Sequence, residues 1–323
     1  MDNAKTVGEG SFKTESSVVK QESKAASAHN VQARGTNKAA EGTMHGLLLF
    51  CGVLSIAFVI AITLFLIVSG VPAIAQIGIV NFLFGTKWAS TANPPSFGIL
   101  PFILTSIYGT LGAVIIAVPI GLLCAIYLSK FATNRMAQVI QSAVELLAGI
   151  PSVVYGLIGM IVVVPAVRNI FGLPDGANLF SAIIVLSVMI LPSLISVSAT
   201  SLRAVPASYE EASLALGANY TETVFKVSVP AAKSGIASAV VLSVGRAIGE
   251  AMAVMMVSGN VANMPGIFKS VRFLTTAVAS EMSYSSGLQR QALFSIALVL
   301  FVFIMIITLL LNFVFKNGKG EES

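Results

Sequence analysis

The chain has 323 residues, of which 56% are hydrophobic and only 10% are charged, and its mean hydropathy is +0.89. A soluble globular protein carries about 25% charged residues, so this composition excludes an ordinary soluble domain and indicates an integral membrane protein. The net charge of +5 does not indicate nucleic-acid binding, because the basic residues are spread along the flanks of apolar segments.

The first segment, residues 1–43, differs in composition from the rest of the chain. It is rich in Ser, Ala, Lys, Glu and Gln and contains a single aromatic residue, Phe12. Such a segment cannot bury enough apolar surface to offset its ordering entropy, so it is predicted to be a disordered cytoplasmic tail. Its length, its mixed charge and the full-length apolar segment behind it distinguish it from a signal peptide.

Six apolar segments follow, each long enough to cross a bilayer, for which about 20 residues are needed. We therefore predict an all-α integral membrane protein with six spanning helices in a transmembrane domain that covers residues 44–318. The predicted spans are Gly46–Val68, Ile99–Leu128, Val139–Val164, Leu179–Leu202, Ala231–Ser258 and Ala292–Phe315. The two cysteines, Cys51 and Cys124, lie within spans and indicate no disulfide framework.

The distribution of positive charge predicts the orientation of the spans. When the N-terminus is placed inside, most of the 19 Lys and Arg residues fall in the inner segments. The outer segments and their edges hold only Lys87, Arg168, Lys269, Arg272 and Arg290. Cytoplasmic segments carry an excess of Lys and Arg, so both termini are predicted to be cytoplasmic. The polar loop between spans four and five, residues 203–230, is then cytoplasmic as well.

The loop 203–230 begins with the signals of a short helix. Ser208 and Glu211 fit a capping box, S-x-x-E, which predicts a helix that begins near Tyr209. Gly217 is expected to end this helix, because glycine readily takes the left-handed conformation that closes many helices. These capping signals alone are equally typical of an ordinary cytoplasmic loop.

A second short helix is predicted after Asn219 or Thr221. Pro230 is expected in the first turn of span five, where the missing N–H of proline has no consequence. The loop is therefore predicted to consist of two helices that are rigidly joined to a membrane span.

Two charged residues, Arg246 and Glu250, lie inside predicted span five in the sequence GRAIGEAMAV. A charge at the bilayer centre costs about 2.5–3.5 kcal/mol on insertion scales, so both residues need a partner or a function. Their i, i+4 spacing places them one turn apart on the same helix face, which is compatible with a structural ion pair. The interpretation we favour is an anion path, in which the Arg246 guanidinium binds a phosphate or carboxylate through two parallel hydrogen bonds and Glu250 competes for Arg246 so that the anion is not trapped.

A third acidic residue, Glu145, lies near the inner end of predicted span three in ELLAGIPSVVYG. It either lines the pathway or reaches the cytoplasmic interface, and the sequence leaves both interpretations open. Ser152 and Tyr155 are pore-lining candidates because of their polarity, although a hydroxyl in a span often bonds its own helix backbone.

The sequence contains no signature of catalysis. It has no G-x-x-x-x-G-K-[ST] phosphate-binding loop, no cluster with metal-ligand spacing and no evident Ser-His-Asp set. The chain is therefore predicted to be non-catalytic and to need neither a cofactor nor a metal. Any ATP hydrolysis that drives it would have to occur in a partner chain.

The loop 203–230 resembles the motif by which importer permeases of the ABC class contact their ATPases, EAA-x3-G-x9-I-x-L-P. Here the motif residues are Glu211, Ala212, Ser213, Gly217, Val227, Val229 and Pro230. The spacing is complete and the three replacements conserve size. The loop 203–230 is called the coupling loop below.

Four further segments resemble the PstC type of phosphate ABC importer permease. They are NFLFGTKWASTANPPSFGILPFI, AVPIGLLCAIYLSKFA, ELLAGIPSVVYGLIG and GRAIGEAMAVMMVSGN. The resemblance implies the type I importer permease fold and a multi-pass protein of the bacterial cytoplasmic (inner) membrane.

The resemblance also implies the partners of the chain. These are a second permease of the PstA type, a dimer of the PstB-type ATPase and an external phosphate-binding protein, all in a lipid bilayer. Glu211, Ala212, Gly217 and Pro230 would then couple the chain to the ATPase. The alternatives are a permease for another oxyanion such as molybdate or sulfate, a secondary transporter or channel, and a membrane enzyme.

Overall fold

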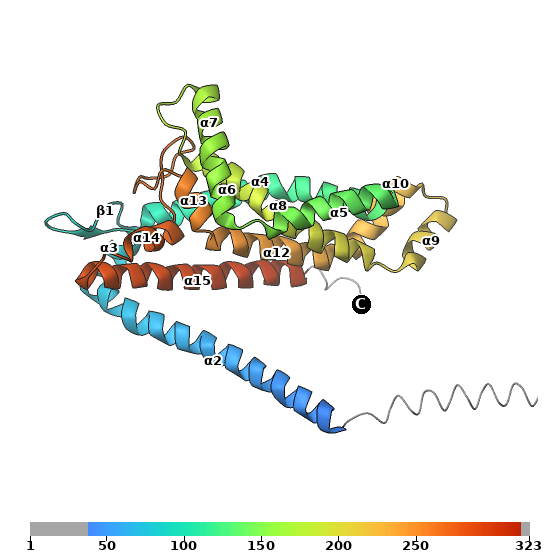
Figure 1. Cartoon of the computed structure of the whole chain (residues 1–323), viewed down its shortest axis with the longest axis horizontal. Helices are drawn as coiled ribbons and strands as arrows, with labels where there is room; N and C mark the ends of the chain where they lie inside the picture. The colour runs from blue at the N-terminus through green and yellow to red at the C-terminus, as the bar shows by residue number, and fades with distance from the viewer. Residues whose placement is uncertain (1–37, 318–323) are drawn as a thin grey trace, which may run out of the picture. The chain divides into compact units, whose positions relative to one another are not determined.

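The computed structural model describes residues 38–317, with side chains described for residues 42–313. The chain divides into two compact units, of which the first ends at Ile62 and the second begins at Thr63. The predicted disordered tail lies largely outside the described residues, but its last residues, from Lys38 onward, belong to helix α2 (Lys38–Ile77). Figure 1 shows the helices and strands, and the contacts discussed below all lie within the second unit.

The described part of the second unit is almost entirely helical. After α2 its elements are α3 (Ile79–Phe84), β1 (Trp88–Ala89), β2 (Ser96–Phe97), α4 (Leu100–Ile126), α5 (Asn134–Gly149), α6 (Ser152–Ile158), α7 (Val164–Phe171), α8 (Leu179–Arg203), α9 (Ala207–Ala215), α10 (Tyr220–Thr223), α11 (Val229–Ala231), α12 (Lys233–Gly249), α13 (Met252–Val257), α14 (Leu274–Glu281) and α15 (Gly287–Asn317). Short π-helical turns follow α4, α6 and α10.

The number of membrane-spanning helices agrees with the prediction. Among the described residues, 5 helices are long and apolar enough to cross a membrane. A sixth span is obtained when Tyr220–Ala231 and Lys233–Gly249, which meet at a bend of 66°, are counted together.

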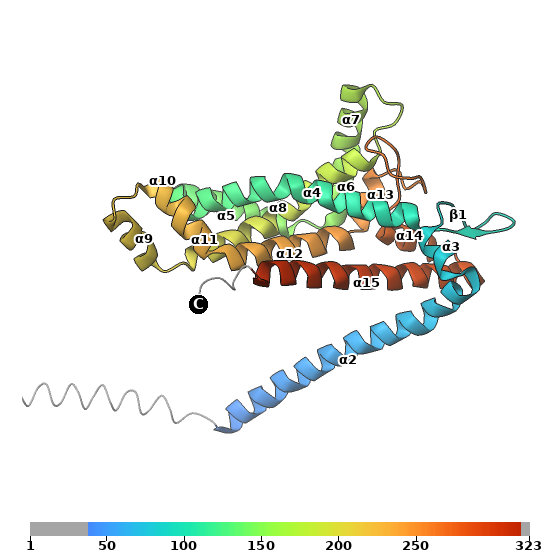
Figure 2. The same cartoon turned by 180° about the vertical axis from the view of Figure 1, so that it is seen from behind.

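Helices α4, α8 and α12 form the centre of the second unit, and α15 packs against α12. Helix α8 is the most buried of the candidate spans, since 61% of its most apolar stretch lies inside the chain. Small residues allow helices to approach closely, and Gly112 and Gly121 of α4 accordingly lie against Ile183 and Leu194 of α8. These helices run side by side in both views (Figure 1 and Figure 2).

A small hairpin that was not predicted lies between α3 and α4. Strands β1 and β2 pair antiparallel, with Trp88 opposite Phe97. The ring of Trp88 lies 5.5 Å from that of Phe97 and 5.6 Å from that of Phe102. Phe82 and Phe102 are completely buried beneath the hairpin. Strands of two residues are too short to produce a detectable alternation in the sequence.

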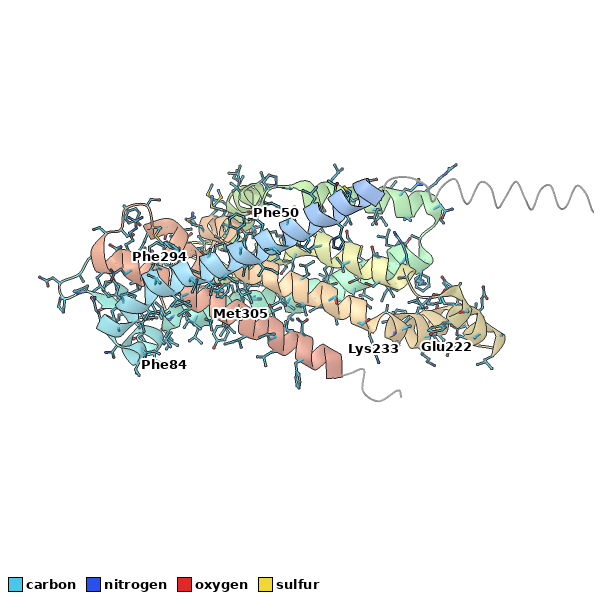
Figure 3. All side chains as sticks on the ribbon, turned by 90° about the horizontal axis from the view of Figure 1, so that it is seen from below. Phe50, Phe84, Glu222, Lys233, Phe294 and Met305 are labelled. Atoms are coloured by element: carbon cyan, nitrogen blue, oxygen red, sulfur yellow. The ribbon has the colours of Figure 1, made fainter. Side chains whose placement is uncertain are left out.

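The coupling loop and the first predicted outer segment lie at opposite ends of the second unit. In Figure 3, Glu222 of the coupling loop lies at one end and Phe84 of the first predicted outer segment lies at the other. Arg272, which was assigned to an outer segment, and Trp88, the neighbour of the outer residue Lys87, contact the same residue, Glu281. The orientation of these ends relative to the cytoplasm stays a prediction.

Two of the six predicted spans are not continuous helices, which corrects the prediction. Span three breaks between α5 and α6 at Pro151, and only Ser152–Phe171 has the length and apolarity of a span. In Figure 1 and Figure 2, α6 and α7 rise steeply away from α4 and α8. Span five breaks between α12 and α13 at Glu250. Both breaks lie inside predicted segments of spanning length, so the length and overall composition of these segments do not reveal them.

Candidate functional site

The first helix of the coupling loop, α9, begins earlier than predicted. Pro206 occupies the N-cap with φ −58° and ψ 135°, and no side chain caps the helix. The predicted capping box of Ser208 and Glu211 is therefore wrong. Because Pro206 fixes the start of the helix, Ser208 already lies inside the first turn and Glu211 lies exposed in the middle of the helix.

Gly217 ends this helix, as predicted. Its φ is 91°, its N–H donates to the Leu214 carbonyl at 2.9 Å, and the next N–H, of Ala218, donates to the Ser213 carbonyl at 3.2 Å. These two bonds form the Schellman motif that closes a helix. An added Cβ at Gly217 would meet nothing within 4 Å, so glycine is required by the backbone conformation and not by lack of space.

The second helix of the coupling loop begins after Asn219, as predicted. The Asn219 side chain accepts the N–H of Glu222 at 2.8 Å, and the Glu222 carboxylate accepts the N–H of Asn219 at 3.2 Å. The capping box of the coupling loop therefore lies here.

The chain then continues through a π-helical turn and α11 to Ala231 and bends by 66° before α12. The expected position of Pro230 in the first turn of span five is wrong, because Pro230 lies in α11, which is neither the first turn of α12 nor the first turn of the bent span that begins at Tyr220. The backbone leaves the helical region at Ala232, with φ −83° and ψ 1°, and this residue produces the bend.

Helix α9 presents apolar side chains outside the predicted spans. None of its residues is buried. Leu214 is 43% exposed and Tyr209 is 54% exposed, while Leu216, directly after the helix, is 91% exposed. The motif residue Ala212 is exposed beside them. A group of exposed apolar side chains on a polar loop is typical of a surface that binds another protein.

The coupling loop is attached to the π-helical turn that follows α4. Lys130 in that turn forms an ion pair with Glu210, whose carboxylate also accepts the Ser228 hydroxyl at 2.8 Å. The Tyr220 hydroxyl donates to the Lys130 carbonyl at 2.6 Å. Burial acts to raise the pKa of Glu210, but the hydrogen bonds from Lys130 and Ser228 and the lysine charge outweigh it, so this pKa lies below its usual value. Burial and the Glu210 charge raise the pKa of Tyr220.

The break in predicted span three follows from Pro151. Because proline has no N–H, the carbonyl of Leu147, four residues earlier, loses its helical donor. The Tyr155 hydroxyl donates to this carbonyl at 2.7 Å, and the Ile150 N–H also donates to it at 3.2 Å. Tyr155 is only 7% exposed, so this residue, predicted to line a pore, stabilises the break from inside the protein.

The break in predicted span five centres on Glu250. Its backbone is extended, with φ −71° and ψ 130°, its carboxylate accepts the Ala253 N–H at 2.9 Å, and its carbonyl accepts the Thr275 hydroxyl at 2.6 Å. The predicted i, i+4 pair of Arg246 and Glu250 requires a continuous helix. The ion-pair interpretation is therefore wrong: within residues 42–313 neither side chain forms an ion pair.

The two breaks lie against each other, because α6 packs on α13. An added Cβ at Gly156 would lie 2.8 Å from the Ala253 Cα, so this close approach requires glycine. Arg246 lies exposed on α12, one turn before the break at Glu250. Arg246, Tyr155 and Glu250 thus belong to one region of irregular backbone. At membrane depth, such backbone is tolerated only where it is buried in protein or lines a water-filled cavity.

The face of α12 that carries Arg246 has few neighbours among the described residues. Ser238 and Leu242 are exposed on it. An added Cβ at Gly245 or Gly249 would meet nothing within 4 Å. The small residues Ser238, Gly245 and Gly249 on or beside this face suit it to close packing against another helix.

Glu145 lies on α5 and not in a span. It is exposed, and its carboxylate accepts a hydrogen bond from the Gln141 side chain at 2.8 Å. The contacts of the described residues do not bring Glu145 together with Arg246 or Glu250.

A buried polar cluster at the opposite end of the second unit escaped the sequence analysis. Glu281, which is 7% exposed, accepts hydrogen bonds from Trp88 at 3.1 Å, Arg272 at 2.5 Å and Gln289 at 3.0 Å. Arg272 also donates to the Asn260 carbonyl at 3.0 and 2.9 Å. Trp88 and Glu281 are 193 positions apart, so no local spacing could reveal the cluster.

Residues 117–317 match the family described as "Binding-protein-dependent transport system inner membrane component". The chain is 39% identical to the probable ABC transporter permease protein YqgH of Bacillus subtilis over 274 residues, which are 83% of this chain and 89% of YqgH. It is 35% identical to the phosphate transport system permease protein PstC of Pasteurella multocida over 245 residues, which are 69% of this chain and 76% of that protein.

Solved structures of ABC transporters have the same fold. A chain of a bacterial alginate ABC transporter aligns with a TM-score of 0.58 at 15% identity and covers 85% of this chain and 96% of its own length. A chain of the MetNI methionine ABC transporter in an inward-facing conformation aligns with a TM-score of 0.51 at 19% identity and covers 68% of this chain and 94% of its own length.

Proposed function

The chain belongs to the family of binding-protein-dependent transport system inner membrane components, and from this premise we propose that it is one permease subunit of an ATP-driven phosphate importer. It is a multi-pass protein of the inner membrane with the type I ABC importer fold. Relatives from Pasteurella multocida and Haemophilus influenzae, at 35% and 33% identity, are named phosphate transport system permease proteins. These names support phosphate over molybdate or sulfate as the substrate.

The coupling loop is the observation that carries the proposed link to a separate ATPase. Leu214 on its helix α9 and Leu216 directly after that helix are exposed outside the spans, and Gly217 closes the helix in a Schellman motif. Glu211 and Ala212 stand exposed on the same helix, as a contact surface for another protein requires. In this proposal an ATPase dimer binds α9, and Pro230 lies in the helix that leads to the bend before span five.

The proposed complex also contains a second permease of the PstA type and an external phosphate-binding protein. The open face of α12 around Gly245 and Gly249 is the proposed contact with the second permease. Both termini and the coupling loop face the cytoplasm in this arrangement. Moving one negative charge inward against the membrane potential costs about 2.3 kcal/mol per 100 mV, so phosphate accumulation needs the energy of the partner ATPase.

The proposed anion path runs past Arg246. Glu250 uses its carboxylate to cap α13, so its role is to hold the helix break, and Arg246 is left to meet the anion between the two permeases. Tyr155 fixes the neighbouring break through its hydrogen bond to the Leu147 carbonyl. Glu145 remains a candidate for the inner end of the path because it is exposed on α5.

Replacing Arg246 by lysine tests the path. Lysine keeps the charge but lacks the planar fork that binds two phosphate oxygens, so Arg246→Lys is expected to lower uptake about tenfold, as the loss of one charge-assisted hydrogen bond would. Arg135→Lys, at an exposed position on α5, is the matched control. Uptake of labelled phosphate is measured at equal membrane abundance. Equal uptake by both variants would remove Arg246 from the path.

The function itself is tested by phosphate uptake in a bacterial strain that lacks its own phosphate permeases. The chain is expressed there with its second permease, ATPase and binding protein. Uptake is expected to depend on ATP and to resist competition by sulfate and molybdate. Stronger competition by either anion would reassign the substrate, and uptake without the ATPase would indicate a secondary transporter.

A further inference from the structure

The coupling loop is held to the spans by its backbone and by side chains. Its backbone is continuous with α8 at Arg203 and with α12 at Ala232, and its side chains contact the π-helical turn Tyr127–Phe131, in which α4 ends. The buried Val224 packs in one cluster with Leu128. The polar part of this contact consists of the Lys130–Glu210 ion pair and the hydrogen bond from the Tyr220 hydroxyl to the Lys130 carbonyl at 2.6 Å. The rings of Tyr220 and Phe131 also meet edge to face at 5.5 Å.

The Lys130–Glu210 pair is largely shielded from water. The side chains of Lys130 and Glu210 are 10% and 18% exposed, whereas those of the other ion pair of this loop, Lys226 and Glu222, are 76% and 44% exposed. A shielded pair interacts more strongly than an exposed one, because water screens it less. The Tyr220 hydroxyl satisfies one of the carbonyls that a helix end leaves without an intrahelical donor.

The coupling loop is also tied together internally. The hydroxyls of Ser213 on α9 and Thr223 on α10 lie 2.9 Å apart in a hydrogen bond. Glu210 on α9 accepts the hydroxyl of Ser228 at 2.8 Å. The two helices of the loop therefore move as one body, and a force on α9 reaches Lys130 directly through Glu210.

The backbone connection to α12 is not straight. The chain bends by 66° at Ala232, and a hollow of about 390 Å³ lies beside the bend, lined among others by Pro206, Tyr209 and Gly235. The hollow leaves the loop room to rotate relative to α12 about its two backbone joints, Ala232 and the end of α8 at Arg203. The side-chain attachment at α4 opposes such rotation, because it adds a point of contact away from both joints.

We propose that Lys130 and Glu210 are positioning residues that transmit the movement of the coupling loop to α4, so that one displacement of the loop moves two spans. This inference rests on the proposed function, since it takes an ATPase as the source of the movement. It assigns a role to an acidic residue that precedes the EAA-type motif and to a lysine from a different cytoplasmic segment.

The experiment compares Lys130→Met, Glu210→Gln, the double variant and the exchanged pair Lys130→Glu/Glu210→Lys in the complete transporter, reconstituted with its ATPase and binding protein. Each single variant is expected to lower phosphate transported per ATP hydrolysed about tenfold, while the ATPase subunit stays bound. The double variant is expected to be no worse than either single variant, and the exchanged pair to regain transport, because interacting residues are not additive.

The matched control is Lys233→Met, which removes an exposed lysine at the start of α12 that belongs to none of the 3 ion pairs of residues 42–313. It is expected to transport as the wild type does. Normal coupling in Glu210→Gln, or equal loss in Lys233→Met, would overturn the proposal. Loss of ATPase binding in Glu210→Gln would also overturn it, since the residue would then act in docking.

A second measurement keeps this test independent of the substrate. Spin labels at the exposed Ile115 on α4 and Ile170 on α7 report the movement of α4 when ATP binds. The distance between the two labels is expected to change on ATP binding in the wild type and to stay the same in Glu210→Gln. An unchanged response in Glu210→Gln contradicts the role of the pair. A wild type that moves but takes up no phosphate contradicts only the proposed substrate.

Discussion

Glu210 is held in its charged form by its surroundings. Burial acts to raise its pKa, but Lys130 and Ser228 lower the pKa below the ordinary value of a glutamate. A carboxyl group whose pKa is lower in the folded than in the unfolded protein contributes stability that is complete above the unfolded pKa. That contribution is lost as the pH falls through the folded pKa.

The stability difference between the wild type and Glu210→Gln is therefore expected to stay constant from about pH 8 to about pH 5 and to shrink only in more acidic solution. A protonated glutamate resembles glutamine, so the two proteins converge there. Lys130 and Tyr220 are the titratable groups that face Glu210 among the described residues. Thermal unfolding of the solubilised complex measures the difference. If the stability difference already decreases between pH 8 and pH 6, it arises from the titration of a group other than Glu210.

For single residues, the sequence predicted which ones are important better than it predicted what they contact. Arg246, Glu250 and Tyr155 were recognised from charge or polarity inside apolar segments, and the structure brings them into one region. Their hydrogen bonds were not predicted. The missing N–H of Pro151 does imply an unsatisfied carbonyl at Leu147, but nothing in the spacing identifies Tyr155 as the donor.

Among the elements, the helix end at Gly217 offers the sharpest test of the coupling loop. An added Cβ has free space there, but φ is 91°, and a β-branched residue is strained in that conformation by about 1–3 kcal/mol. Gly217→Val is expected to distort the end of α9 and to reduce phosphate uptake, while the chain still inserts into the membrane.

Gly217→Asn is the matched control, because asparagine tolerates the left-handed conformation at a helix end. It is expected to retain most of the uptake. The measurement is uptake at equal membrane abundance, together with recovery of the ATPase subunit on purification. Full uptake by Gly217→Val would show that the geometry of this helix end does not matter for coupling.

The close contact of α6 with α13 can be tested by comparing alanine substitutions at two glycines, one inside the contact and one outside it. Gly156→Ala places a Cβ 2.8 Å from the Ala253 backbone and is expected to destabilise the chain by about 1–3 kcal/mol through overpacking. Gly149→Ala, at the end of α5, meets nothing within 4 Å and is expected to be neutral. Unfolding of the purified full chain in mixed micelles measures both. Equal effects would contradict the packing argument.

The number and type of the spans could be predicted because apolar length is a property of composition. The interruptions could not, since Pro151 also fits within a kinked helix and the spacing of Arg246 and Glu250 also fits one face of a continuous helix. The start of α9 was misplaced because Pro206 determines it more strongly than the S-x-x-E pattern does. The β1–β2 hairpin depends on aromatic packing between distant residues, which no local pattern encodes.

Across the whole molecule, the cluster around Glu281 joins segments that are far apart in the chain. Glu281→Gln leaves the partly buried Arg272 without its counter-charge and is expected to destabilise the folded chain by about 3 kcal/mol. Glu222→Gln is the matched control, because it removes the charge of an exposed pair while glutamine keeps the capping box. Unfolding in mixed micelles compares them. A small effect at Glu281 would show that the cluster is not a structural element.

The two polar clusters lie at opposite ends of the second unit and have different tasks. The one at Glu281 fixes the hairpin, α14 and the start of α15 to one another. The one at Lys130 connects two helical segments that the proposed mechanism requires to move together. Since both depend on pairs distant in sequence, neither follows from the spacing of residues along the chain.

Gly245 lies in the interior of α12, where glycine is less favourable than alanine by about 1 kcal/mol. An alanine side chain there would meet nothing within 4 Å in the described structure. Packing among the described residues therefore does not require a glycine at this position. In the proposed complex, the reason is the shape of the neighbouring permease. Natural selection at this position then acts on the assembled pair, and the gene for one subunit retains a residue whose benefit is realised only in the presence of the other.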